Sequence, residues 1–156
     1  LLISQLPWEM KWLSKADFFK YPLVGWLMHM AGDIKLIRGK RDSIVAAMDA
    51  CKDRLSKNVS VMIFPEGTRS DDGELRKFKD GAFRLAIETG TPILPLVLDG
   101  THPALQKGDW RFGVADAEVR VLEPVETAGL KMEDLSVLRD RIHTMIADEL
   151  ALMKAG

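Results

Sequence analysis

The residues best suited to chemistry lie in one short turn, Phe64-Pro65-Glu66-Gly67-Thr68-Arg69-Ser70, which follows an apolar run of strand length. Ligand sites of α/β proteins commonly lie directly after a buried strand. Pro65 can end the strand, and Gly67 can adopt backbone angles that other residues avoid. Glu66 and Arg69 place opposite charges close together, and a guanidinium group can bind phosphate oxygens in pairs. The turn is therefore a candidate anion site, with a solvated turn held by an ion pair as the alternative.

Two further cationic residues are candidates for the same anion. Lys79 lies in Phe78-Lys79-Asp80-Gly81-Ala82, where a helix is expected to start and where free N–H groups favour a phosphate. Arg38 follows another predicted strand and carries the same planar fork of donors. The alternative for Arg38 is a surface salt bridge with Asp42.

Apolar runs predict the strands that must position these residues. Residues 59–64 and 93–98 are near-continuous apolar runs, a pattern typical of buried parallel strands. Residues 8–14, 34–37 and 117–122 predict shorter strands.

Helices are predicted between these strands. Residues 16–30 form one very apolar stretch, and residues 81–89 form a helix that Gly90 would end. Two further helices follow from apolar residues at three- and four-residue spacing, one with Asp42 as its N-cap: Ile44, Val45, Met48, Cys51 and Leu55, and then Leu135, Leu138, Ile142, Met145, Ile146 and Met153. The alternation predicts an α/β fold with a largely parallel or mixed central sheet flanked by helices, in one domain spanning residues 1–156.

Composition excludes several classes of function. Lys and Arg total 22 against 23 Asp and Glu, so no basic excess is available to bind nucleic acid. The one cysteine, Cys51, allows no internal disulfide and favours a reducing compartment. The sequence contains no run of 18 apolar residues that would predict a transmembrane helix.

Three sequence blocks resemble the glycerolipid acyltransferase family, whose best-known members acylate 1-acylglycerol-3-phosphate. They are a GDIKLIRG block that contains Arg38, the FPEGTRS block followed by FKDGA, and a TPILPLVLDGT block, and they occur in the family's order. The similarity runs from Trp8 to about Gly113. The resemblance implies the family's fold and a reaction in which a fatty acyl group moves to a lysophospholipid hydroxyl to give phosphatidic acid.

The resemblance also implies a set of site residues. The residues expected to bind the acceptor substrate and its phosphate are Arg38, Glu66, Gly67, Thr68, Arg69, Lys79 and Gly81. Pro92 and Pro95 are expected to contact the acyl donor or to form the site wall, with strand punctuation as the alternative. Glu66 cannot attract a phosphate, so we expect it to orient Arg69 or to accept a hydrogen bond from a glycerol hydroxyl.

A general base is needed as well, and histidine suits neutral pH. The family uses Asn-His followed by four residues and Asp, upstream of the arginine block, and the 156 residues contain no such sequence. His29 and His102 lack the aspartate, whereas His143 and Asp148 have the spacing but diverge by about 140° on one helix. We therefore expect the histidine and aspartate of the motif to precede Leu1. The chain as given is then expected to contain no catalytic residue and to be nearly inactive.

Two other functions remain as alternatives. The sequence Val97-Leu98-Asp99-Gly100-Thr101 is similar to the nucleophile loop of haloacid dehalogenase-like phosphatases, but Val97 stands where that chemistry needs an aspartate. A degenerate family member that binds a lipid or a partner without catalysis is the second alternative.

The expected partners follow from the lipid substrate. They are the lysophospholipid, an acyl donor that is either acyl-CoA or acyl carrier protein, and a membrane surface on its cytoplasmic face; no nucleic acid, metal ion or bound cofactor is expected. Docking at the surface is easier than lifting the lipid into water. The candidate docking residues are Trp8, Trp12, Phe18, Phe19, Trp26 and Met30, with core packing as the alternative.

Overall fold

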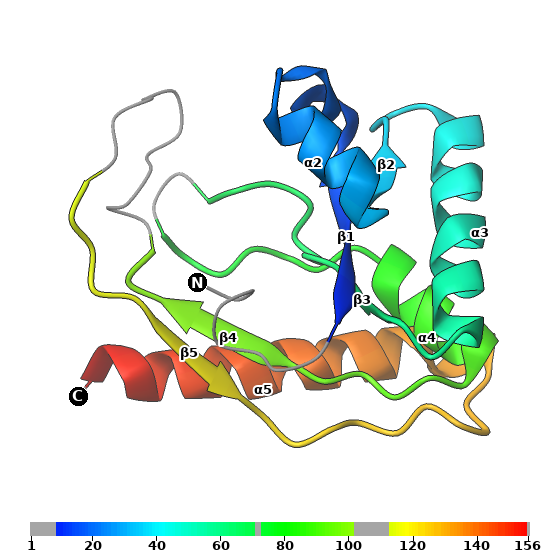
Figure 1. Ribbon diagram of the computed structural model, residues 1–156. Coiled ribbons are helices and arrows are strands. Elements are labelled where there is room, and N and C mark those ends of the chain that lie inside the picture. Colours follow the sequence, from blue (N-terminus) through cyan, green and yellow to red (C-terminus); the bar gives the residue numbers. More distant parts are fainter. Residues whose placement is uncertain (1–8, 71–72, 102–112, 156) are drawn as a thin grey trace. The chain divides into compact units, whose positions relative to one another are not determined.

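The computed structural model of the chain describes residues 9–70, 73–101 and 113–155 (Figure 1). The described residues form two compact units, one ending at Phe64 and the other beginning at Pro65. We refer to residues 9–64 as the N-terminal unit and to the described residues from Pro65 onward as the C-terminal unit. A single domain spanning residues 1–156 stays a prediction.

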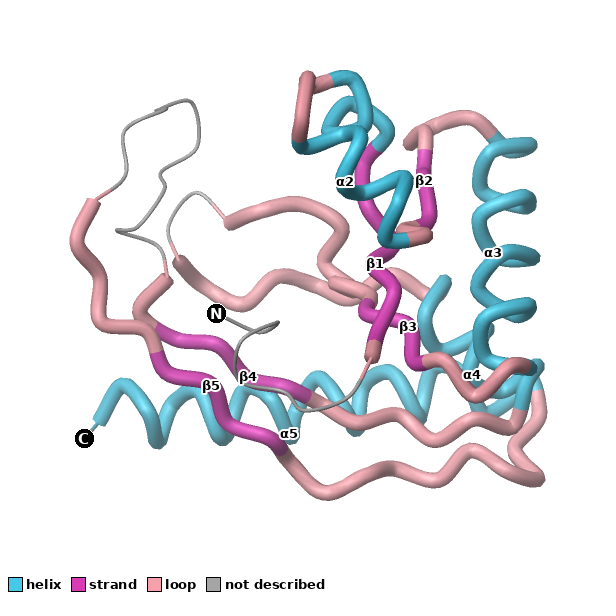
Figure 2. The backbone as a smooth tube through the Cα atoms, in the orientation of Figure 1, coloured by secondary structure: helices cyan, strands magenta, loops and turns pink. Residues whose placement is uncertain are grey.

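A three-stranded parallel sheet forms the centre of the N-terminal unit (Figure 2). Its strands are β1 (Met10–Lys15), β2 (Ile34–Leu36) and β3 (Ser60–Met62), in the order β2-β1-β3. Helix α3 (Arg41–Ser56) connects β2 to β3 and contacts all three strands, with Ala47 and Cys51 fully buried. The prediction of parallel strands covered by helices is confirmed here.

The predicted helix over residues 16–30 is wrong as one element. The segment forms a 3-10 helix, η1 (Ala16–Lys20), and a separate helix α2 (Val24–Ala31). Pro22 interrupts them, because proline disfavours helical backbone in the residue before it. Leu23 then has φ 67° and ψ −59°, and the Val24 N–H donates to the Pro22 carbonyl at 2.8 Å. This tight turn projects Leu23 outward, since its side chain is 68% exposed.

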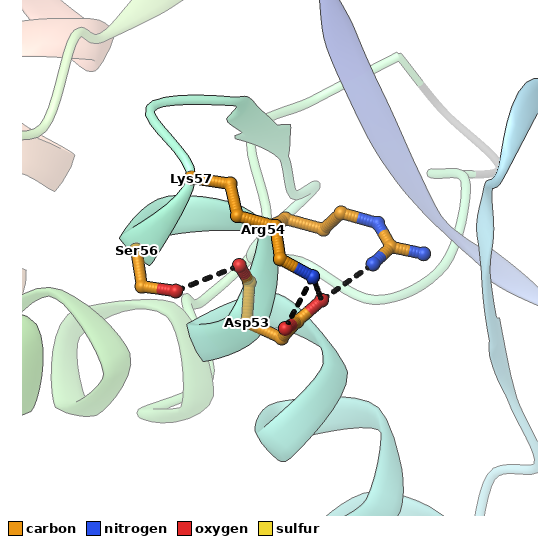
Figure 3. A network of polar contacts seen from close by, with 4 residues as sticks. All are labelled: Asp53, Arg54, Ser56 and Lys57. Atoms are coloured by element: carbon orange, nitrogen blue, oxygen red, sulfur yellow. Dashed lines mark hydrogen bonds and ion pairs between the residues drawn. The ribbon is translucent and has the colours of Figure 1, made fainter.

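The start of α3 differs from the prediction, and ion pairs surround its last turn. The helix begins after Lys40, so the prediction of Asp42 as the N-cap is wrong, and Asp42 lies in the first turn. At the other end, the Asp53 carboxylate pairs with Arg54 at 2.6 Å and with Lys57 at 2.7 Å (Figure 3). These partners, Lys57 first, hold the pKa of Asp53 below its usual range.

The C-terminal unit combines two helices with an antiparallel pair of strands. Its elements are α4 (Gly81–Thr89), β4 (Leu96–Asp99), β5 (Glu118–Val121), η3 (Met132–Asp134) and α5 (Leu135–Ala155). The register pairs Leu96 with Val121 and Asp99 with Glu118. The second half of the apolar run at residues 93–98 thus lies in an antiparallel strand, β4, and not in a parallel one. The predicted α/β class is confirmed, with one parallel and one antiparallel sheet in the described residues.

The core of this unit lies between α4, α5 and the loop that precedes α4. Its buried members are Phe78, Phe83, Val125, Leu138 and Ile142. The fully buried Thr127 hydroxyl contacts the carbonyls of Ala86 and Thr91 at 3.1 and 2.8 Å, which ties the end of α4 to the segment after β5. Gly90 ends α4 in the left-handed conformation, as predicted.

Candidate functional site

The predicted anion turn belongs to a loop, residues 65–80, whose two ends are joined by hydrogen bonds. The Lys79 N–H donates to the Pro65 carbonyl at 2.9 Å. The Arg76 N–H donates to Oε2 of Glu66 at 3.1 Å. The chain therefore leaves β3, forms the turn and returns to its starting point immediately before α4. We call residues 65–80 the closed loop.

Gly67 and Lys79 meet inside the closed loop. Gly67 has φ +72°, a conformation that costs an L side chain about 1–2 kcal/mol. A Cβ atom at Gly67 would lie 2.7 Å from Nζ and 3.0 Å from Cε of Lys79. The lysine side chain thus occupies space that only glycine leaves open, and its ammonium group lies against the Gly67 backbone. Lys79 makes no ion pair within the part of the chain that the structure describes, so its charge is available to a ligand.

Glu66 is half-buried, which distinguishes it from the exposed cations around it. Burial raises the pKa of its carboxyl group, while the Arg76 N–H, the Arg76 charge and His143 act in the opposite direction. Sequence reasoning did not single out Arg76, because its contribution is a backbone N–H and so leaves no signal in residue type. With one oxygen held by Arg76, Glu66 has a fixed orientation.

The remaining predicted residues of this region lie at the surface. Thr68 and Arg69 are exposed in the turn, and Gly81 is the first residue of α4 with open space where a Cβ would stand. Asp80 precedes it and pairs with Arg139 of α5 at 2.8 Å. Arg139 thereby offsets an acidic charge that would oppose an anion at the start of α4.

Arg38 lies in the N-terminal unit, in the exposed turn between β2 and α3. The Ile37 N–H donates to Oγ of Ser43 at 2.9 Å, and Gly39 follows with φ 79°. The alternative salt bridge with Asp42 is not formed, and Arg38 has no ion pair or side-chain hydrogen bond with any described residue. The guanidinium group of Arg38 is available to a ligand. That Arg38 and Arg69 bind the same ligand stays a prediction.

The two predicted wall prolines differ in environment. Pro92 is exposed, whereas Pro95 is buried directly before β4. The Pro95 carbonyl accepts a hydrogen bond from the Leu122 N–H at 3.0 Å, and Ile93 bridges Val125. These contacts fit the alternative, in which the prolines mark the start of a strand. A role in the site wall stays a prediction.

The two described histidines pack against aromatic rings. His29 of α2 lies 5.0 Å from the Phe19 ring, and His143 of α5 lies 4.7 Å from the Phe78 ring, both measured between centroids. Helix α5 runs without a break through His143 and Asp148. Their side chains therefore diverge, and the two residues do not form the catalytic histidine–aspartate pair.

The expected position of the family's catalytic motif is not covered by the structure. The motif is expected to precede Leu1, and Leu1 itself belongs to residues 1–8, which lie outside the described residues. The third histidine of the chain, His102, falls outside them as well. The prediction that the catalytic histidine and aspartate precede Leu1 therefore stays a prediction.

Comparison with known proteins decides the family. A sequence model described as "Acyltransferase" matches residues 1–99 of this chain, which include Arg38 and the whole FPEGTRS block. The chain belongs to the Acyltransferase family. The resemblance inferred from the three sequence blocks is thereby confirmed.

Several curated members of the family are similar to most of this chain. A chloroplastic 1-acyl-sn-glycerol-3-phosphate acyltransferase of Arabidopsis thaliana is 43% identical over 91% of this chain and 39% of its own length. A relative from Brassica napus is 37% identical over 92% of this chain and 40% of its own length. The human alpha form is 33% identical over 93% of this chain and 52% of its own length. The chain thus spans about two fifths to one half of these relatives.

A solved structure of the family supports the fold. The crystal structure of the 1-acyl-sn-glycerophosphate acyltransferase PlsC from Thermotoga maritima superposes with a TM-score of 0.75 at 29% identity. It matches 94% of this chain and 57% of that one. The α/β fold is therefore that of this acyltransferase.

Proposed function

We propose that this protein transfers a fatty acyl group to the free hydroxyl of a lysophospholipid, with 1-acylglycerol-3-phosphate as acceptor and phosphatidic acid as product. The hydroxyl oxygen would attack the thioester carbonyl of acyl-CoA or of acyl carrier protein, and the thiol would leave. Relatives named for this activity support the proposal. The observation that carries it is the Lys79 ammonium against Gly67 in the closed loop, a cationic position with a glycine backbone beside it.

Each residue of the proposed site has a distinct task. Arg38, Arg69 and Lys79 would neutralise the acceptor phosphate, the arginines through paired hydrogen bonds and the lysine as a point charge. Glu66 is held by Arg76 and would keep the turn in shape while its second oxygen accepts from a glycerol hydroxyl. The acceptor phosphate would be bordered by Thr68 and Gly81. The acyl donor would be bordered by Pro92 and Pro95.

Proton removal is assigned to no described residue. His29 is exposed on α2, and the residue at the aspartate offset is Ile34, which is buried in β2. His143 contacts Phe78 and diverges from Asp148. The proposal therefore places the base in an Asn-His-x4-Asp group that these 156 residues do not contain. A lipid- or partner-binding module without catalysis is the second candidate, and it uses the same anion site.

Replacing Gly67 by alanine tests the contact with Lys79. We expect Gly67→Ala to lower the free energy of unfolding by about 1–2 kcal/mol through backbone strain, and to weaken binding of lysophosphatidate about 10-fold because Lys79 must move. Gly129→Ala is the matched control, since Gly129 has φ +84° but open space at the Cβ position. Urea unfolding measures the first effect, and binding to lysophosphatidate in mixed micelles measures the second.

The two variants should lose similar stability and differ only in binding. Equal binding by Gly67→Ala and Gly129→Ala would contradict the assignment of Lys79 to the headgroup.

The proposed membrane contact lies on η1 and α2. These elements and the turn between them expose large apolar side chains, namely Phe18, Tyr21, Leu23, Val24, Trp26, Leu27 and Met30. The segment contains no acidic residue between Phe18 and Ala31, so no carboxylate would oppose an anionic leaflet. We call this group the apolar face and propose that it docks on the cytoplasmic surface of the membrane.

The structure changes the set of docking candidates. Three of the predicted docking residues are exposed and remain candidates: Phe18, Trp26 and Met30. Trp12 is half-buried against Phe64, with ring centroids 5.9 Å apart. Phe19 is half-buried against His29, and Trp8 lies outside the described residues. No helix in the described residues has both the length and the hydropathy that a membrane span requires.

Vesicle flotation tests the apolar face. Trp26→Ser and Met30→Ser should each reduce binding to phosphatidylcholine vesicles containing phosphatidic acid by about 10-fold, because each removes a large exposed side chain. Val137→Ser, an equally exposed change on α5, should float like the wild type. Unchanged flotation of both α2 variants would exclude this face as the docking surface.

A further inference from the structure

Leu23, in the turn between η1 and α2, stands at a position where the local backbone disfavours leucine. Its φ of 67° and ψ of −59°, with the Val24 N–H bonded to the Pro22 carbonyl at 2.8 Å, form a γ-turn with positive φ, which is a rare and strained conformation. Leu23 is also the N-cap of α2, where its side chain has no oxygen to accept the free N–H groups of the first turn. Two local costs therefore fall on one residue.

Packing does not offset these costs. The Leu23 side chain is 68% exposed, and Val24 and Trp26 beside it are exposed as well. A side chain that is mostly in water gains little from burial on folding. Strained backbone that brings no packing gain is characteristic of positions kept for function.

The turn is held rigidly by the contact between η1 and α2. The N–H of the buried Gly25 donates to the Tyr21 carbonyl at 2.8 Å. A Cβ atom at Gly25 would lie 2.2 Å from the carbonyl oxygen of Phe19, so the backbone of η1 lies directly on α2 at this glycine. The Phe19 ring also contacts the imidazole of His29, with centroids 5.0 Å apart. Figure 2 shows η1, the turn and α2 together beyond the carboxyl end of β1.

The surroundings of the turn suit a phospholipid leaflet. Tyr21 and Trp26 are exposed there, and both are residue types that concentrate at the level of the lipid headgroups. The one carboxylate of η1, that of Asp17, pairs with Lys15 and Lys20 at 2.5 and 3.2 Å. The border of the apolar face therefore carries a net positive charge, which favours an anionic headgroup.

We propose that Leu23 is an insertion tip, a side chain that the strained turn presents so that it enters the acyl layer of one leaflet when the apolar face docks. The inference rests on the docking of that face under the proposed function. Contact with hydrocarbon gives Leu23 the apolar surroundings that folding does not provide. Gly25 is then a positioning residue, because it seats η1 on α2 and so fixes the turn before a membrane is met.

Leu23→Gly tests the proposal, because it should make the fold more stable and docking weaker. Glycine adopts positive φ freely and is a better N-cap than leucine, so the urea midpoint should rise above that of the wild type. Flotation with phosphatidylcholine vesicles, in high salt that screens the lysines, should fall about 10-fold because the tip is lost. Leu23→Ala should float as poorly without the gain in urea midpoint, whereas Leu23→Met keeps an apolar tip and should float like the wild type.

Four outcomes decide the matter. If Leu23→Gly floats like the wild type while Trp26→Ser does not, the apolar face stands and the insertion tip is wrong. A urea midpoint of Leu23→Gly below that of the wild type would show that leucine serves the fold, and would also overturn the proposal. A wild-type dimer that dissociates in Leu23→Gly without vesicles would make a second copy of the chain the occupant instead of the leaflet. If Leu23→Gly loses flotation while the wild type floats but fails to bind lysophosphatidate, the proposed acyl transfer falls and the role of Leu23 stands.

Discussion

Acyl transfer to lysophosphatidate by this 156-residue chain is expected to be about 10² to 10⁴ times slower than acyl transfer by the Thermotoga maritima enzyme, the range that loss of a general base produces. Attack on the thioester requires a group that removes the hydroxyl proton. Neither described histidine forms a hydrogen bond or ion pair with a carboxylate of the described residues, and each packs on an aromatic ring, His29 on Phe19 and His143 on Phe78. A thioester-cleavage assay that follows thiol release measures the rate.

Binding distinguishes an absent base from a misfolded chain. Lysophosphatidate should still bind, because the proposed headgroup residues are present in the folded units. Added imidazole should raise the rate by supplying a base from solution. A wild-type rate comparable to that of the Thermotoga maritima enzyme would contradict the assignment of the base outside this chain.

Replacing Arg38 by alanine should raise the Kd for lysophosphatidate about 10- to 150-fold, the effect of losing hydrogen bonds to a charged group. The side chain is exposed and has no described partner, so the change should leave urea unfolding unaltered. The Kd of Arg38→Lys should lie between those of the wild type and Arg38→Ala, because lysine keeps the charge but lacks the planar fork of donors. Isothermal titration with lysophosphatidate in mixed micelles gives the Kd values.

A nearby arginine provides the control for net charge. Arg41, exposed at the start of α3, is not assigned to the site, so Arg41→Ala should bind nearly as tightly as the wild type. If Arg41→Ala weakens binding as much as Arg38→Ala does, the effect is one of overall charge and Arg38 has no specific role.

Elements with strong local signals could be predicted from the sequence. Helix α4 has the predicted bounds and ends at Gly90 in the left-handed conformation. The apolar spacing predicted for α5 is confirmed by burial of Leu138, Ile142 and Met153. In both cases the residues that specify the helix lie within it or directly after it, so their spacing suffices.

Features that depend on distant partners could not be predicted in this way. The run at residues 93–98 is apolar enough for a parallel strand, but its pairing with β5 is antiparallel, and pairing direction leaves no trace in composition. The break at Pro22 had a signal in the proline itself, which the continuous apolar pattern on both sides outweighed.

The site shows the same division. Gly67 and Lys79 were predicted by type, and the structure brings them into contact. The Arg76 N–H was missed because any residue type provides a backbone donor. His143 was judged only as a partner for Asp148, and its position beside Phe78 depends on how α5 packs.

A double-mutant cycle on Arg38 and Arg69 tests the central claim most directly, namely that both guanidinium groups bind one headgroup phosphate. The cycle compares lysophosphatidate binding by the wild type, Arg38→Ala, Arg69→Ala and the double variant. Sharing one phosphate predicts a coupling energy of about 0.5–3 kcal/mol, as for residues that act on a common partner. Losses that add to within about 0.3–0.5 kcal/mol would show independent sites and contradict the account.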